Sequence, residues 1–197
     1  ATRTPIGKAP RGMFRNTRPD DLLVAAIRSA LKQVPTLDPA AIEDAIVGCS
    51  FPEGEQGINM ARVAAVIAGL PHSVGGVTVN RFCASGVTAL QMAADRIRVG
   101  EADVMIAGGA ESMSMVPMGG NKPSFNPAVF AKDENVGIAY GMGLTAERVA
   151  EQWKVSRERQ DAFALASHQK ALAAIDSGAA RKKLDAFVGF ARSQAGG

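Results

Sequence analysis

Apolar residues recur at two different spacings along the first 110 residues of the chain. Between residues 19 and 32 they return every three or four positions. Residues 60–68 and 84–99 follow the same spacing, so each of these segments is predicted to be a helix. Residues 45–49 are instead a compact apolar run and residues 77–80 a run rich in β-branched residues, and both are typical of strands. The second and third helical segments each stop at a glycine, a common helix end.

A third strand is predicted over residues 103–107, which are apolar along their length as a buried strand would be. Strands and helices thus alternate up to residue 109, and this order predicts an α/β fold with a mostly parallel sheet flanked by helices. Residues 1–17 are predicted to be a loop.

The composition and the hydrophobic pattern of the sequence change after residue 114. Residues 115–143 are rich in Gly and Pro and show little periodicity, so they are predicted to be an inserted loop segment. Two helices are expected to follow, the first capped by Thr145 and the second by Ser156. The chain therefore combines an α/β layer with a helical and loop insertion.

Composition narrows the function classes. The 197 residues are 47% hydrophobic and 21% charged, which is ordinary for a globular protein. The net charge of +3 is mild, and no basic stripe with interleaved aromatics is present, so nucleic acid is not an expected partner. No apolar run is long enough to span a membrane. The two cysteines and two histidines lack metal-ligand spacing, so no metal site is expected, and a reducing, cytoplasmic compartment is the expectation.

Cys83 is the strongest candidate for chemistry. The predicted strand ends at Asn80, Cys83 occupies the turn, and a helix is expected to begin at once. The helix dipole and the free N–H groups at a helix start favour a thiolate over a thiol. The same N–H groups can donate to the oxyanion of a thioester under attack. The alternative is a cysteine buried in the core; that interpretation is preferred for Cys49, whereas position alone leaves both open for Cys83.

The segment around Cys83 resembles the nucleophile signature of the thiolase family. Other family landmarks stand in order along residues 3 to about 175. The nucleophile segment reads VNRFCASG at 79–86, and the other landmarks are RTPIGK at 3–8, GINMAR at 57–62, GEADVMIAGGAESMS at 100–114, MGLTAERVAEQW at 142–153 and SRERQDAFALASHQKA at 156–171. Ketoacyl synthases share the fold and the cysteine, but they are not expected to carry AESMS or the last of these helices.

The resemblance implies a domain organisation. Residues 1–114 would form the amino-terminal thiolase domain that carries the nucleophile, and residues 115–197 part of the loop domain, with an atypical tail after residue 175. The fold would be the first half of the thiolase-like layered fold. The family's strand before RTP and its second half, with a catalytic histidine and a second cysteine, lie outside this sequence. General acid–base catalysis raises the rate of a reaction by about 10²–10⁴-fold. Without the family's catalytic histidine, this chain alone is therefore expected to show little thiolysis. We also expect the missing first strand to leave a gap in the core.

The implied activity is acyl transfer between a 3-ketoacyl-CoA and CoA through an acyl-cysteine intermediate. The segments GGNKPS at 119–124 and NVGIAYGMG at 135–143 are more similar to degradative 3-ketoacyl-CoA thiolases, which act in fatty acid β-oxidation, than to acetoacetyl-CoA thiolases. A biosynthetic acetoacetyl-CoA thiolase remains an alternative. So does a non-catalytic thiolase-like dimerisation module.

The resemblance also implies roles for individual residues. Cys83 matches the acylated cysteine. Met142 matches a methionine that lines the pocket near the thioester, with a core methionine as the equal alternative. Asn80 would hold the turn through backbone hydrogen bonds, and Asn59 and Arg62 would support the site or a subunit interface.

Coenzyme A would act as substrate, with no cofactor and no metal. The partners would be acyl-CoA and CoA, and the assembly a homodimer or homotetramer that pairs through residues 77–80. His72 and His168 are not expected to be the catalytic base. Gly108 and Gly109 are interpreted as glycines for close packing, because the remaining residues of a phosphate-binding loop are absent.

Overall fold

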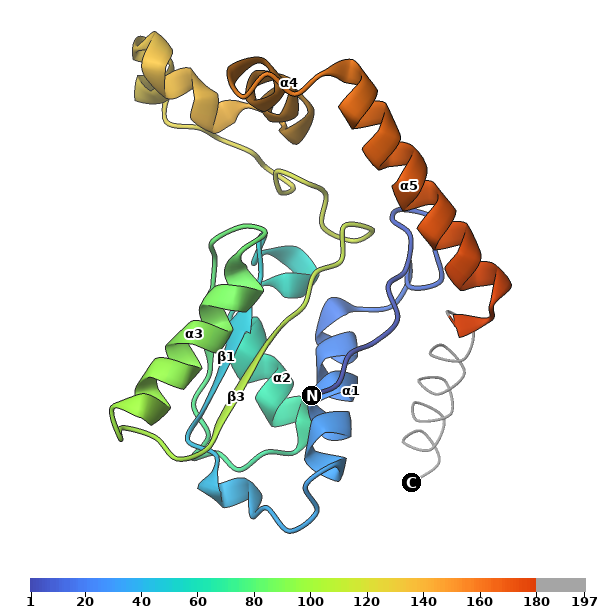
Figure 1. Ribbon diagram of the computed structural model, residues 1–197. Coiled ribbons are helices and arrows are strands. Elements are labelled where there is room, and N and C mark those ends of the chain that lie inside the picture. Colours follow the sequence, from blue (N-terminus) through green and yellow to red (C-terminus); the bar gives the residue numbers. More distant parts are fainter. Residues whose placement is uncertain (180–197) are drawn as a thin grey trace. The chain divides into compact units, whose positions relative to one another are not determined.

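A computed structural model describes residues 1–179 of the chain (Figure 1). The fold divides into two units, one ending at Lys122 and one beginning at Pro123. In the first unit helices and strands alternate in the predicted order. The elements are α1 (Pro19–Lys32), β1 (Asp44–Gly48), α2 (Met60–Ala68), β2 (Val77–Val79), α3 (Ser85–Arg98) and β3 (Met105–Gly109), with 3₁₀ turns η1 (Pro39–Ala41) and η2 (Gly54–Gln56). This confirms the predicted α/β class.

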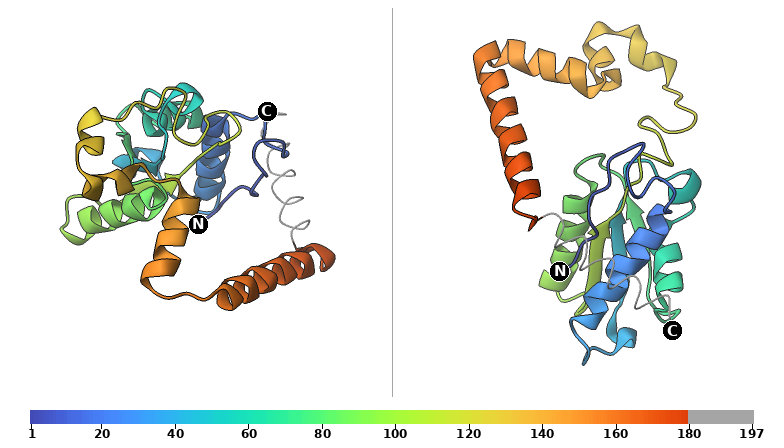
Figure 2. Two further views of the ribbon diagram at one scale, coloured as in Figure 1. Left: turned by 90° about the horizontal axis from the view of Figure 1, so that it is seen from above. Right: turned by 90° about the vertical axis from the view of Figure 1, so that its right-hand side faces the viewer.

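The three strands form one parallel sheet in the order β2-β1-β3. Central β1 is buried on both faces. Ile46 packs with Ala89 and Ala93 of α3, whereas Val47 packs with residues of α1 and α2. Figures 1 and 2 show α3 on one face of the sheet and α1 with α2 on the other. The first unit is thus a three-layer α/β/α arrangement.

The third strand departs from its prediction in bounds and in burial. β3 spans Met105–Gly109 rather than 103–107. It begins later because the Asp103 N–H donates to the Glu43 carboxylate at 3.0 Å and not to a strand. It ends later because Gly108 and Gly109 still pair with Val47 and Gly48 of β1. It is only partly buried, because it lies at the edge of the sheet that residues 1–179 form. The apolar pattern alone does not distinguish an edge strand from a central one.

A cavity of about 390 Å³ lies along β3. Its walls are residues 1–9, which form a loop as predicted, the inner face of α1, and residues 106–114. Ile106 and Gly108 line it, which explains why β3 is less buried than its sequence suggests.

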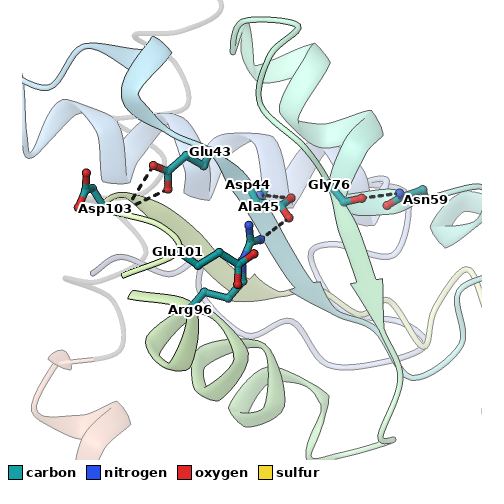
Figure 3. Close-up of polar contacts among 8 residues, drawn as sticks. All are labelled: Glu43, Asp44, Ala45, Asn59, Gly76, Arg96, Glu101 and Asp103. Carbon is teal, nitrogen blue, oxygen red and sulfur yellow. Dashed lines mark hydrogen bonds and ion pairs between the residues drawn. The ribbon is translucent and has the colours of Figure 1, made fainter. Parts of the chain in front are cut away.

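Charged side chains fasten the amino ends of the strands (Figure 3). Arg96 of α3 donates to the Asp44 carboxylate at 2.8 Å and to Glu101 at 3.0 Å. The Asp44 side chain is 14% exposed and also accepts from the Ala45 N–H at 2.9 Å. This group ties α3 to the start of β1.

Replacing Asp44 with alanine is expected to lower the free energy of unfolding by about 1–3 kcal/mol, because it leaves a half-buried arginine with one partner fewer. Urea denaturation measures the change. Asp95→Ala is the matched control: it removes an exposed ion pair with Arg98, which is worth at most about 0.5 kcal/mol. Equal losses in the two variants would contradict the assigned role of Asp44.

The second unit is helical. It contains short 3₁₀ segments at Pro127–Ala131 and Asp133–Ala139, which the loop prediction missed, then α4 (Met142–Gln152) and α5 (Arg157–Asp176). Ser156 caps α5 as predicted, its Oγ accepting from the Arg159 N–H at 3.4 Å. The Thr145 cap is wrong: α4 already begins at Met142, and the Thr145 hydroxyl instead donates to the Gly141 carbonyl.

The predicted domain boundary between residues 114 and 115 falls within the first unit and stays a prediction. The predicted atypical tail reaches beyond residue 179 and lies mostly outside the described residues. None of the helices in residues 1–179 has the length and apolar character needed to cross a membrane.

Candidate active site

Cys83 lies in a tight turn between β2 and α3, where the sequence places it. Within this turn Phe82 adopts a left-handed conformation with φ 46°, which is uncommon for a residue other than glycine. Three hydrogen bonds hold it: the Phe82 N–H donates to Asn80 Oδ1 at 2.9 Å, the Arg81 N–H donates to Ser85 Oγ at 2.8 Å, and Ser85 Oγ donates to the Phe82 carbonyl at 2.5 Å. Asn80 therefore makes the backbone contact that its predicted role requires, and the role itself stays a prediction.

The Cys83 thiol is free and exposed. It precedes α3 by two residues, because α3 begins at Ser85 rather than at Ala84. The backbone N–H groups of Gly86 and Val87 have no hydrogen-bond partner among residues 1–179. Unpaired donors and the positive end of the dipole make a helix start suitable for negative charge. A nucleophilic sulfur and potential oxyanion donors thus occur on one short segment.

Two glycines allow the start of α3 to approach the sheet. A Cβ on Gly48 would lie 2.6 Å from the Gly86 nitrogen and 2.7 Å from the Ser85 carbonyl oxygen. A Cβ on Gly109 would lie 3.2 Å from the Gly48 oxygen, so the close-packing interpretation of Gly109 is confirmed. The same interpretation is wrong for Gly108, where a Cβ would meet nothing within 4 Å because the position faces the open cavity.

Cys49 is buried, whereas Cys83 is exposed. Cys49 is 1% exposed, which confirms the predicted core position. Burial, together with the nearby Glu111 carboxylate, raises the pKa of the Cys49 thiol to about 12. Because the thiolate is the reactive form, Cys49 is protected by both access and protonation.

Low-dose iodoacetamide at pH 8 is therefore expected to alkylate Cys83 and leave Cys49 unmodified. Raising the pH to 10 should not expose Cys49 to reaction, since that remains well below its pKa of about 12. Peptide mass spectrometry of both cysteines in one sample measures the two rates. Equal labelling of Cys49 and Cys83 in the folded protein would contradict this assignment.

Asn59 and Arg62 fasten α2 to the segment before β2. Asn59 caps α2 by accepting from the Arg62 N–H at 3.2 Å, and its amide donates to the Gly76 carbonyl at 2.8 Å (Figure 3). The Thr78 hydroxyl donates to Asn59 Oδ1 at 2.9 Å, and the Arg62 guanidinium donates to the Val74 carbonyl. Both residues thus support the strand that leads to the nucleophile turn, and any further role stays a prediction.

Met142 and His168 belong to the second unit, whereas His72 lies in the first. Met142 is the first residue of α4 in the second unit and is 60% exposed, so its predicted pocket role stays a prediction. His72 is exposed, and its carbonyl accepts from Arg62. His168 is exposed on α5.

Sequence reasoning missed two residues that shape the turn. Gly48 lies within the predicted strand at residues 45–49 and the apolar pattern does not single it out, although a glycine in a strand often marks a close backbone approach. Ser85, which the sequence pattern does not single out, is 3% exposed; it accepts from the Arg81 N–H and donates to the Phe82 carbonyl. A serine at a helix start is a recognised signal for such local hydrogen bonds.

Comparison with known proteins identifies the family of the chain. The family model described as "Thiolase, N-terminal domain" matches residues 1–184. The chain is 47% identical over 176 residues to a 3-ketoacyl-CoA thiolase of Bacillus subtilis (strain 168), covering 89% of this chain and 44% of that protein. It is 46% identical over 185 residues to a 3-ketoacyl-CoA thiolase of Escherichia coli O1:K1 / APEC, covering 93% of this chain and 47% of that protein.

A 3-ketoacyl-CoA thiolase of Colwellia psychrerythraea shows a similar relation, with 46% identity over 170 residues, 86% of this chain and 43% of that protein. The chain thus spans less than half the length of the curated relatives it matches. The match nevertheless includes the strands, the turn around Cys83 and the helices of the second unit. This chain belongs to the thiolase family.

Proposed function

We propose that this chain supplies the acyl-accepting part of a 3-ketoacyl-CoA thiolase, an acyltransferase of fatty acid β-oxidation. The observation that supports this most is the exposed thiol of Cys83 in the turn before α3, whose N–H groups at Gly86 and Val87 have no hydrogen-bond partner among residues 1–179. The names of the relatives support the same substrate class.

The proposed reaction has two steps. The Cys83 thiol loses its proton and its sulfur attacks the ketone carbon of a 3-ketoacyl-CoA. The bond between that carbon and C2 then breaks, and C2 keeps the electron pair, takes a proton and leaves as acetyl-CoA. The CoA thiol next attacks the acyl group on sulfur, which yields a shortened acyl-CoA and returns the cysteine. Coenzyme A is thus a substrate, and no cofactor is proposed.

Within this proposal the first unit positions the nucleophile. Helix-start N–H groups aimed at a developing oxyanion lower the barrier without reorganising, and loss of one such donor in other acyl-transfer enzymes costs about 10²–10³-fold. Asn80 and Ser85 keep the turn in shape by their hydrogen bonds to Phe82. Met142 is proposed to line the acyl pocket, as its match to the family implies.

The assembly and location are also proposals. The outer edge of β2 carries no ladder partner among residues 1–179, which supports pairing of two copies along this strand in a homodimer or homotetramer. Both cysteines are free thiols, which supports a reducing, cytoplasmic compartment.

Substrate comparison tests the proposed function. Release of acetyl-CoA is followed for this chain mixed with CoA and either acetoacetyl-CoA or a long-chain 3-ketoacyl-CoA. Slow release from both, with the long-chain substrate at least as fast, is expected. Release from acetoacetyl-CoA alone would favour the acetoacetyl-CoA thiolase alternative, and release from neither, together with no acyl transfer to the protein, would overturn the proposal.

A further inference from the structure

Gln56, at the end of the 3₁₀ turn η2, is a fully buried polar side chain with 0% exposure. Its amide donates to the Phe51 carbonyl at 2.8 Å and to Glu111 Oε1 at 2.7 Å, and its oxygen accepts from the Ser112 N–H at 2.5 Å. A buried amide is costly unless it is bonded, and here both ends of the amide are satisfied. Gln56 therefore joins the chain after β1 to the chain after β3.

Glu111 completes this connection from the end of β3. Its second carboxylate oxygen accepts from the Ser50 N–H at 2.7 Å, and its first accepts from Gln56 and, at 3.7 Å, from the Cys49 thiol. Hydrogen bonds to an ionised acceptor are stronger than neutral ones. Together Glu111 and Gln56 fix the backbone of Ser50 and Phe51 directly beyond the end of β1.

Phe51 connects this hydrogen-bonded segment to the turn that holds Cys83. Its ring lies 6.1 Å from the ring of Phe82, with the planes tilted by 57°, a separation at which aromatic pairs attract. Phe82 precedes Cys83 and holds the left-handed conformation, which persists only when its surroundings enforce it.

We propose that Glu111 and Gln56 are positioning residues for Cys83, acting through Phe51 and its ring contact with Phe82. The inference rests on the proposed function of Cys83 as the acyl acceptor. Neither residue is a catalytic residue, because the hydrogen bonds of both go to the chain after β1 and β3 and not to Cys83. Their effect is to keep the cysteine at the start of α3.

Iodoacetamide alkylation of Cys83 tests the inference without any acyl-CoA. Glu111→Gln keeps the side-chain volume but turns one acceptor into a donor that faces another donor. It is expected to slow alkylation of Cys83 at pH 7 by about threefold to tenfold, the equivalent of one lost hydrogen bond. Acyl transfer to Cys83 should slow by a similar factor at unchanged KM.

Two further variants separate positioning from simple stabilisation. Phe51→Leu removes the ring contact but keeps the backbone carbonyl that Gln56 binds, and it should slow alkylation as Glu111→Gln does. Glu53→Gln is the matched control, since its carboxylate in the same loop bonds the Asn121 N–H and not the turn; its rate should stay within about twofold of the unsubstituted protein.

The inference is overturned if Glu111→Gln and Glu53→Gln alkylate at the same rate, or if Glu111→Gln lowers only the melting temperature. Should Glu111→Gln fail to fold, an unchanged rate in Phe51→Leu overturns it as well. If alkylation slows as expected but the unsubstituted protein accepts no acyl group, positioning is supported and the proposed function fails.

Discussion

Replacing Cys83 with alanine is expected to abolish acyl transfer from 3-ketoacyl-CoA to this chain, a loss of about 10⁴-fold or more. The reason is covalent: in the proposed reaction the Cys83 sulfur carries the acyl group, and the other thiol, Cys49, is buried with a raised pKa. The Cys83 side chain is exposed, so its removal should change the free energy of unfolding by less than about 0.5 kcal/mol. Mass spectrometry of the intact protein after incubation with acetoacetyl-CoA measures the transfer.

Unfolding in urea provides the control for this variant, because it shows whether the fold survives. Cys49 serves as an internal reference in the same samples, because this buried thiol is not expected to acquire an acyl group. An alanine variant that is folded and still acquires an acyl group at the original rate would show that Cys83 is not the acceptor.

Replacing Gly48 with alanine is expected to lower the free energy of unfolding by about 3 kcal/mol or more, at the upper end of overpacking effects. The added Cβ would meet the backbone of Ser85 and Gly86, and backbone at the start of a helix cannot move aside as a flexible side chain can. Relief requires α3 to shift away from β1, which also displaces the turn that holds Cys83. Thermal and urea denaturation measure the loss, and alkylation of Cys83 reports the displacement.

Gly86→Ala is the matched control for Gly48→Ala. A Cβ at Gly86 meets nothing within 4 Å, so alanine in this first helical turn should be neutral or stabilise by up to about 1 kcal/mol. If Gly48→Ala were as stable as Gly86→Ala, the account of how α3 seats on the sheet would be wrong.

Much of the first unit is predictable from the sequence because local signals and global fold agree there. Pro19 opens α1 and Gly69, with φ 88°, ends α2, so both helices begin and end where propensity and periodicity place them. β1 is predicted within one residue because it is buried on both faces and reads as a continuous apolar run.

The details of the site are less predictable because they depend on contacts between distant segments. The burial of Gln56 and the ring contact of Phe51 with Phe82 arise only when the ends of the parallel strands meet. Periodicity also fails for β3, since an edge strand beside a cavity has the same apolar sequence as a central strand. Thr145 shows a third limit, because a residue type that often caps helices does not always mark a helix start. Met142 and Gly143 already lie inside α4, so this helix begins before Thr145.

The measurement that bears most directly on the proposed chemistry locates the acyl group on the chain. The protein is incubated with acetoacetyl-CoA, part of the sample is then chased with CoA, and both parts are digested for peptide mass spectrometry. We expect an acetyl group on the peptide that contains Cys83 and none on the peptide that contains Cys49. During the chase the acetyl group is expected to leave as acetyl-CoA. An unmodified Cys83, or an acetyl group that CoA does not remove, would contradict the proposed chemistry.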